Sequence, residues 1–164
     1  MKKDGYLGGA TVSQLVLVIL STNGVDFQGV WHEFAREMRR RDGVFGLHGR
    51  MNYYGAFDPE QVKYAWDHLC EQAGVEQLLH SHVTCCHVED GTVKGVIAET
   101  KAGRRAILAK RVVDTTGDGY VAGQSGVGWD QGDGEHDYAM ALTKVFRMGN
   151  VNWPENWDRK AIAD

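Results

Sequence analysis

The stretch Arg111-Val112-Val113-Asp114-Thr115-Thr116-Gly117-Asp118-Gly119 carries the sharpest structural signal in the chain. Its β-branched residues predict a strand, and the polar run that follows them predicts a tight turn. We expect a short helix over residues 120–125. A strand that ends in such a turn before a helix places backbone N–H groups and one carboxylate where α/β folds bind ligands.

Asp118 lies between two glycines in this turn, Gly117 and Gly119. Its carboxylate would accept hydrogen bonds from sugar or ribityl hydroxyls. The glycines would let such a ligand approach the backbone, because a side chain there would occupy the ligand's space. The same residues also suit a plain strand-to-helix turn with a capping aspartate, and both interpretations are open on composition alone.

Two helices are predicted upstream of this turn. Apolar residues recur at three- and four-residue spacing over residues 29–41, and Asp42-Gly43 ends that helix. The second helix has Asp58 as its cap, Pro59 at its first position and Gly74 just after its end.

The region between the second helix and the turn predicts an antiparallel meander, because short apolar runs alternate there with the turn signals Glu89-Asp90-Gly91 and Lys101-Ala102-Gly103. Beyond the turn we expect a polar loop over residues 131–137 and one further strand over residues 141–148. The strands predicted for the meander cover residues 75–79, 83–88, 93–99 and 106–108.

Composition narrows the class of protein. A chain of 164 residues with 43% hydrophobic and 24% charged residues is long enough for one domain and excludes disordered and collagen-like classes. A net charge of −4 with dispersed basic residues argues against a nucleic-acid partner. Three cysteines without a disulfide framework favour a reducing compartment, so we expect a cytoplasmic protein. The apolar run over residues 12–20 is too short to span a membrane.

Several side chains suggest other chemistry, and a simpler interpretation is favoured for each. Cys85 and Cys86 are adjacent and would point to opposite faces of a strand, so they cannot form one four-ligand metal site with the nearby histidines. A cysteine nucleophile is also disfavoured, because no histidine–acid partner can be assigned to it from the sequence. The run Arg39-Arg40-Arg41 suits a solvated helix end, although it could pair with phosphate. Core or interface packing is favoured for the tryptophans. The histidines concerned are His80, His82 and His87, and the tryptophans are Trp31, Trp66, Trp153 and Trp157.

The run Asp114-Thr115-Thr116-Gly117-Asp118-Gly119-Tyr120-Val121-Ala122 resembles a motif of the FAD-dependent oxidoreductases of the glutathione-reductase-like superfamily, Asp-Ala-Thr-Gly-Asp-Gly-Asp-Val-Ala. The resemblance covers almost the whole chain, because other motifs follow the family's order. They are Gly5-Tyr6-Leu7-Gly8-Gly9-Ala10-Thr11, Phe57-Asp58-Pro59-Glu60, Ala73-Gly74-Val75, Leu79-His80, Gly95-Val96 and Phe146-Arg147-Met148.

The resemblance implies an α/β fold, a partial Rossmann-like FAD-binding domain with an inserted antiparallel β-meander. It implies that residues 1–140 form this domain and that residues 141–164 begin a truncated substrate domain. It also implies three groups of cofactor-binding residues. The turn of Gly117, Asp118 and Gly119 would approach the ribityl or phosphate portion of the flavin. The loop with Gly8, Gly9 and Thr11 would lie near the flavin, and the backbone of the strand residue Val83 would touch adenine.

The sequence also departs from the family pattern. Thr115 replaces a small residue and Tyr120 replaces a common aspartate, and neither change is expected to abolish the turn. Family members start with a strand and a Gly-x-Gly-x-x-Gly turn that holds the pyrophosphate, and none precedes Lys2-Lys3-Asp4 here. We therefore expect an internal fragment of such an enzyme.

The function implied by this resemblance is FAD-dependent two-electron oxidation or reduction of a small molecule. No catalytic acid or base can be assigned, because one scaffold supports many reactions. Two alternatives stay open: a truncated module that folds, as a monomer or a homo-oligomer, without binding flavin, and a subunit completed by a second chain that supplies the phosphate loop.

Overall fold

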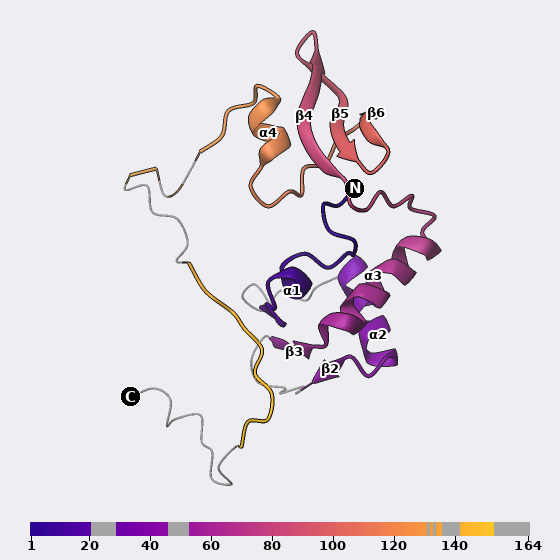
Figure 1. Cartoon of the computed structure of the whole chain (residues 1–164), viewed down its shortest axis with the longest axis vertical. Coiled ribbons are helices and arrows are strands. Elements are labelled where there is room, and N and C mark those ends of the chain that lie inside the picture. Colours follow the sequence, from indigo (N-terminus) through magenta and orange to yellow (C-terminus); the bar gives the residue numbers. More distant parts are fainter. Residues whose placement is uncertain (21–28, 46–52, 131, 133, 136–141, 153–164) are drawn as a thin grey trace.

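The computed structural model describes residues 1–20, 29–45, 53–130, 132, 134–135 and 142–152. The helices and strands of these residues gather into two halves (Figure 1). The helical half consists of α1 (Ala10–Ser13), α2 (Val30–Arg40), α3 (Pro59–Gln72) and the strands β1 (Val18–Leu20), β2 (Val44–Phe45) and β3 (Tyr53–Phe57). The meander half consists of β4 (His82–Glu89), β5 (Thr92–Thr100), β6 (Gly103–Leu108) and α4 (Tyr120–Gln124).

Local sequence signals determine both ends of α3. The Asp58 carboxylate accepts hydrogen bonds from the backbone N–H groups of Glu60 and Gln61, at 2.8 and 3.0 Å. After the helix, Gly74 adopts φ +65° and the N–H of Val75 donates to the carbonyl of Cys70, which is the bond that closes a Schellman motif. The predicted cap and stop of this helix are therefore confirmed.

The core of the helical half lies where α2 packs against α3. The indole of Trp66 stacks on the fully buried ring of Phe34, with 4.6 Å between centroids. Trp31 packs edge-on against both rings, so the packing role predicted for these two tryptophans is confirmed. Trp153 and Trp157 lie outside the described residues. The buried apolar residues of this core are Val12, Phe34, Met38, Phe57, Val62 and Ala65.

A small antiparallel sheet with the strand order β1-β3-β2 completes the helical half. In its register Val18 pairs with Ala56 and Val44 pairs with Phe57. No sequence signal predicted these short strands, because their pairing joins residues far apart in the chain.

The predicted meander is confirmed in the strands β4, β5 and β6, which pair antiparallel in chain order. Asp90 and Gly91 both adopt positive φ in the first hairpin turn, as a tight two-residue connection requires. The strand predicted over residues 75–79 is wrong. Its end and the residue after it bond to the N-terminal residues instead: the N–H of Lys2 donates to the carbonyl of Leu78, and the N–H of His80 donates to the carbonyl of Asp4.

Two other predicted strands are also wrong. Residues 111–113 form no ladder with any described strand, and the side chain of Val113 is 83% exposed. Residues 142–148 are likewise neither helix nor strand, and residue 141 is not described. Among the described residues neither segment has the partner strand that a sheet requires, and β-branched or apolar residues alone do not make a strand, because strand propensity depends on pairing and burial.

The mixture of helices and strands agrees with the predicted α/β class. Both sheets in the described part of the chain are antiparallel. The predicted loop at residues 131–137 falls largely outside the described residues. None of the described helices is long and apolar enough to cross a membrane.

Candidate functional site

Asp114 organises the turn that the sequence singles out. Its Oδ1 accepts a hydrogen bond from the N–H of Thr116, and its Oδ2 accepts hydrogen bonds from the N–H groups of Val121 and Ala122, each at 2.9 Å. These bonds lower the pKa of the Asp114 carboxyl, with the bond from Thr116 as the largest cause and that from Ala122 next. The carboxylate thus closes the turn and caps α4 from outside the helix.

The backbone of the turn requires its two glycines. Gly117 adopts φ +90°, and Gly119 adopts the left-handed conformation with φ +63° at the start of α4. A Cβ atom at either position would meet no heavy atom within 4 Å. The glycines are therefore needed for conformation, and the space beside them is open to a ligand.

Asp118 is exposed, and it lies between Thr116 and Tyr120, which are bonded to each other. The N–H of Tyr120 donates to Oγ1 of Thr116 at 3.0 Å, so this bond joins the residues two positions before and after Asp118. Within the described residues, the Asp118 carboxylate has no hydrogen-bond or ion-pair partner. The capping role that the sequence left open belongs to Asp114, and Asp118 keeps its full capacity to accept hydrogen bonds.

Helix α4 packs against β4, on the side of that strand away from β5 (Figure 1). Val121 is 6% exposed and forms a small core with Cys86 and Val96. Val83, a predicted cofactor-binding residue, is partly buried against the same core. The structure thus brings Val83 and the turn into one half of the molecule.

The other predicted segment, Gly8, Gly9 and Thr11, belongs to the helical half. Gly8 adopts φ +116°, and a Cβ atom there would collide with the side chain of Val12 in the helical core. Gly9 adopts φ +55° at the start of α1, with open space around its missing Cβ, and Thr11 is half-buried within α1. In the described part of the chain no hydrogen bond or ion pair joins this segment to the turn at Asp118.

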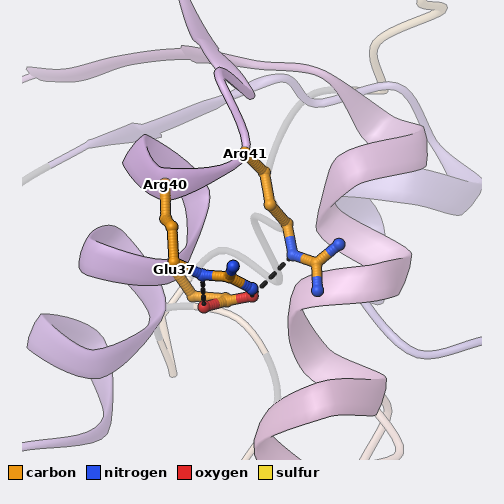
Figure 2. A network of polar contacts seen from close by, with 3 residues as sticks. All are labelled: Glu37, Arg40 and Arg41. Carbon is orange, nitrogen blue, oxygen red and sulfur yellow. Dashed lines mark hydrogen bonds and ion pairs between the residues drawn. The ribbon is translucent and has the colours of Figure 1, made fainter.

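The helical half contains a charged network that the sequence did not reveal (Figure 2). The carboxylate of Glu37, a residue that is only 7% exposed, accepts two hydrogen bonds from Arg40 at 2.7 and 2.9 Å and one from Arg41 at 2.6 Å. The bond from Arg40 is the largest cause that lowers the pKa of Glu37, which falls to about 2 although burial opposes the shift. Arg41 also lies over the ring of Tyr64 on α3, 5.9 Å from its centroid.

The triple arginine is solvated at Arg39 and Arg40, as predicted, but the sequence did not reveal the ion pairs with Glu37. Arg40 and Arg41 bind the carboxylate of Glu37 at the end of α2. The acidic residue one turn earlier was the available signal, since residues at i, i+3 and i, i+4 meet on a helix.

The cysteines and histidines do not assemble into a metal site in the part of the chain that the structure describes. His80 precedes β4 and adopts φ +49°, so it shares no strand with His82, the first residue of β4. Cys85 is exposed and Cys86 is buried, as strand alternation predicts. Burial, followed by the charges of Cys85 and Asp114, raises the pKa of the Cys86 thiol, which disfavours a nucleophilic thiolate.

A family model described as FAD dependent oxidoreductase matches residues 1–164. The chain belongs to the FAD dependent oxidoreductase family. FAD is the cofactor that the family name gives, and it was the cofactor predicted from the motif at Asp114. No curated protein and no solved structure matches the chain.

The residues of the turn fit a flavin in their chemistry. A ribityl chain carries hydroxyl donors, and Asp118 offers two unengaged carboxylate oxygens to them. Gly117 and Gly119 leave open space on each side of that carboxylate. This turn is therefore the candidate FAD site of the chain.

Proposed function

We propose that this chain contributes the flavin-binding part of an FAD-dependent oxidoreductase that performs two-electron redox chemistry on a small molecule. The family match supports the enzyme class. The observation that carries the placement of the cofactor is the difference between two aspartates: both carboxylate oxygens of Asp114 accept backbone N–H groups, whereas Asp118 is exposed and unengaged in the described structure.

In this proposal Asp118 accepts a hydrogen bond from a ribityl hydroxyl, and Gly117 and Gly119 leave room for the cofactor chain beside the backbone. A bond from a hydroxyl to a carboxylate is stronger than one between neutral groups, so it fixes the orientation of the ligand. Because Thr116 and Tyr120 are already bonded to each other, the carboxylate is presented without ordering the turn at the moment of binding.

The remaining predicted contacts are extensions of the same proposal. The backbone of Val83 on β4 would lie near adenine, and the segment of Gly8, Gly9 and Thr11 would lie near the flavin. The reactive part of the flavin takes up or releases the electron pair, and the protein supplies binding and orientation. We also propose residues 1–140 as the flavin-binding domain, residues 141–164 as the start of a substrate domain, and a cytoplasmic location.

The proposal is tested by loading the purified chain with FAD and recording its absorbance in the flavin bands, followed by a fluorescence titration for the affinity. Asp118→Ala should weaken FAD binding by about tenfold or more, since a hydrogen bond to a charged group is lost. The matched control is Asp67→Ala, which removes an exposed carboxylate on α3. Equal affinity in both variants and the unchanged chain would reject the role of Asp118.

Two other results have clear meanings. A colourless protein that no FAD concentration loads would favour the non-catalytic module over the enzyme. Flavin binding that requires a second polypeptide would favour a subunit completed by a complementing chain. If the chain binds FAD as a homo-oligomer and Asp118→Ala still weakens that binding, the proposed site stands.

A further inference from the structure

The outer edge of β4 is covered by two side chains of α4. β4 is an edge strand of the described meander sheet. Every second residue along it therefore points its N–H and C=O groups away from β5. The hydroxyl of Tyr120 donates to the carbonyl of Thr84 at 3.0 Å, and the N–H of Cys86 donates to Oε1 of Gln124 at 2.7 Å. One helix therefore satisfies a donor and an acceptor on neighbouring outward positions of the strand.

The spacing of these contacts follows from the two backbones. Tyr120 and Gln124 are one helical turn apart, which corresponds to about 6 Å along a helix axis. Thr84 and Cys86 are two residues apart on a strand, which corresponds to about 6.8 Å. The two spacings match when α4 lies along β4 in the same direction, and Val121 of the same helix packs with Cys86 and Val96.

The same helix end also holds the turn. Tyr120 contacts β4 through its side chain and donates its backbone N–H to Thr116 across the turn. Asp114 binds the N–H groups of Val121 and Ala122, which are the next residues of α4. Any displacement of α4 from β4 therefore moves the donors that define the conformation around Asp118.

We propose that Tyr120 and Gln124 form a two-point clamp on the edge of β4 that positions the turn of Gly117, Asp118 and Gly119 for the flavin. They are positioning residues and make no contact with the cofactor. The consequence for flavin rests on the proposed function, but the positioning of the turn does not. The departure of Tyr120 from the family's common aspartate gains a reason in this arrangement, because the tyrosine hydroxyl donates to the carbonyl of Thr84 and an ionised aspartate has no proton to donate.

The test measures hydrogen–deuterium exchange of single amides in the flavin-free protein by NMR. The reporters are the N–H groups of Tyr120 and Ala122, whose acceptors are Thr116 and Asp114 and not the clamp residues. In Gln124→Met the acceptor for Cys86 is lost while side-chain length is kept, and exchange at both reporters should rise by about tenfold. Gln124→Glu keeps an acceptor oxygen and should restore slow exchange.

Matched controls separate this effect from general destabilisation. Gln72→Met removes an exposed glutamine amide on α3, and Tyr64→Phe removes a hydroxyl that makes no hydrogen bond within the described residues. Both controls should leave the reporters unchanged, whereas Tyr120→Phe should raise exchange at Ala122. Unchanged reporters in Gln124→Met would overturn the clamp.

A flavin titration of the same variants then separates the two proposals. The affinity for FAD should fall about three- to tenfold in Gln124→Met and recover in Gln124→Glu, consistent with the loss of one hydrogen bond that orders the site. Faster exchange without any loss of affinity would overturn the positioning role for the flavin. Faster exchange in a chain that binds no FAD at all would reject the proposed function and leave the clamp on the turn established.

Discussion

Two carboxylates, Glu37 in the helical half and Asp114 in the meander half, each accept three hydrogen bonds, but from different kinds of donor. Glu37 is buried and binds the charged guanidinium groups of Arg40 and Arg41. Asp114 is half-exposed and binds three backbone N–H groups. The first carboxylate neutralises charges and joins side chains, whereas the second fixes the path of the backbone.

This difference explains where stability and ligand binding are expected to reside. The network of Glu37 lies beside the large apolar core and joins the end of α2 to α3 through Arg41 and Tyr64. The cap at Asp114 stabilises a short exposed turn and leaves a second aspartate, Asp118, unengaged in the described structure. Changes in the helical half should therefore lower global stability, and changes in the turn should act locally.

The largest expected effect is that of Phe34→Ala. This change empties a fully buried position that contacts Trp66 and Phe57, and it should lower the free energy of unfolding by about 3–5 kcal/mol. The comparison variant Val121→Ala removes two methyl groups from the smaller core and should cost about 1–2 kcal/mol. Urea unfolding measures both losses of free energy. Equal losses would show that the core around Phe34 does not contribute more stability than the core around Val121.

Glu37→Gln should have the next largest effect. The variant keeps the shape of the side chain but loses the charge that three donors share, and it should lower the free energy of unfolding by about 1–3 kcal/mol. The exposed side chain of Arg40 remains solvated, which limits the cost. Glu71→Gln on the exposed side of α3 is the matched control and should be neutral in urea unfolding. A neutral Glu37→Gln would mean that the network contributes no stability.

The pH dependence of stability should separate the same two variants. The pKa of Glu37 is lowered from 4.5 to about 2 in the folded state, so its contribution is complete above pH 4.5 and is lost as pH falls towards 2. Unfolding midpoints between pH 5 and pH 2 should therefore fall less steeply in Glu37→Gln than in the unchanged chain or in Glu71→Gln. Parallel curves would contradict the assigned pKa.

The local sequence signals predicted those parts of the fold that depend on neighbouring residues. The cap at Asp58, the stop at Gly74 and the hairpin turn at Gly91 are each specified within a few residues, and the structure confirms them. The strands predicted at residues 75–79, 111–113 and 141–148 are wrong in their described residues, because a strand needs a partner that the local sequence does not specify. The order β1-β3-β2 was missed for the same reason.

The candidate site was predicted in part. The sequence identified the turn and its glycines, and it left open whether an aspartate caps the helix or binds a ligand. It did not reveal that Asp114 reaches seven and eight residues ahead to Val121 and Ala122, because helix capping is normally recognised within three residues. Glu37 was missed because an acidic residue on an amphipathic helix is usually solvated.

Asp114→Ala should produce the smallest change in global stability and the clearest local one. Loss of the carboxylate frees the N–H groups of Thr116, Val121 and Ala122, so their hydrogen exchange should quicken while the urea midpoint changes little. Asp130→Ala, which removes an exposed carboxylate beyond α4, is the control and should leave these amides unchanged. A large drop in the urea midpoint would show that the turn is part of the main stabilising core.

The most direct measurement for the flavin site is a titration of the isotope-labelled chain with FAD, followed by amide NMR. We predict that the signals of Gly117, Asp118 and Gly119 shift most, whereas those of Gly91 in the first hairpin turn and Gly103 at the start of β6 stay in place. Shifts that spare the turn while FAD binds elsewhere on the chain would contradict the assignment of Asp118 to the cofactor.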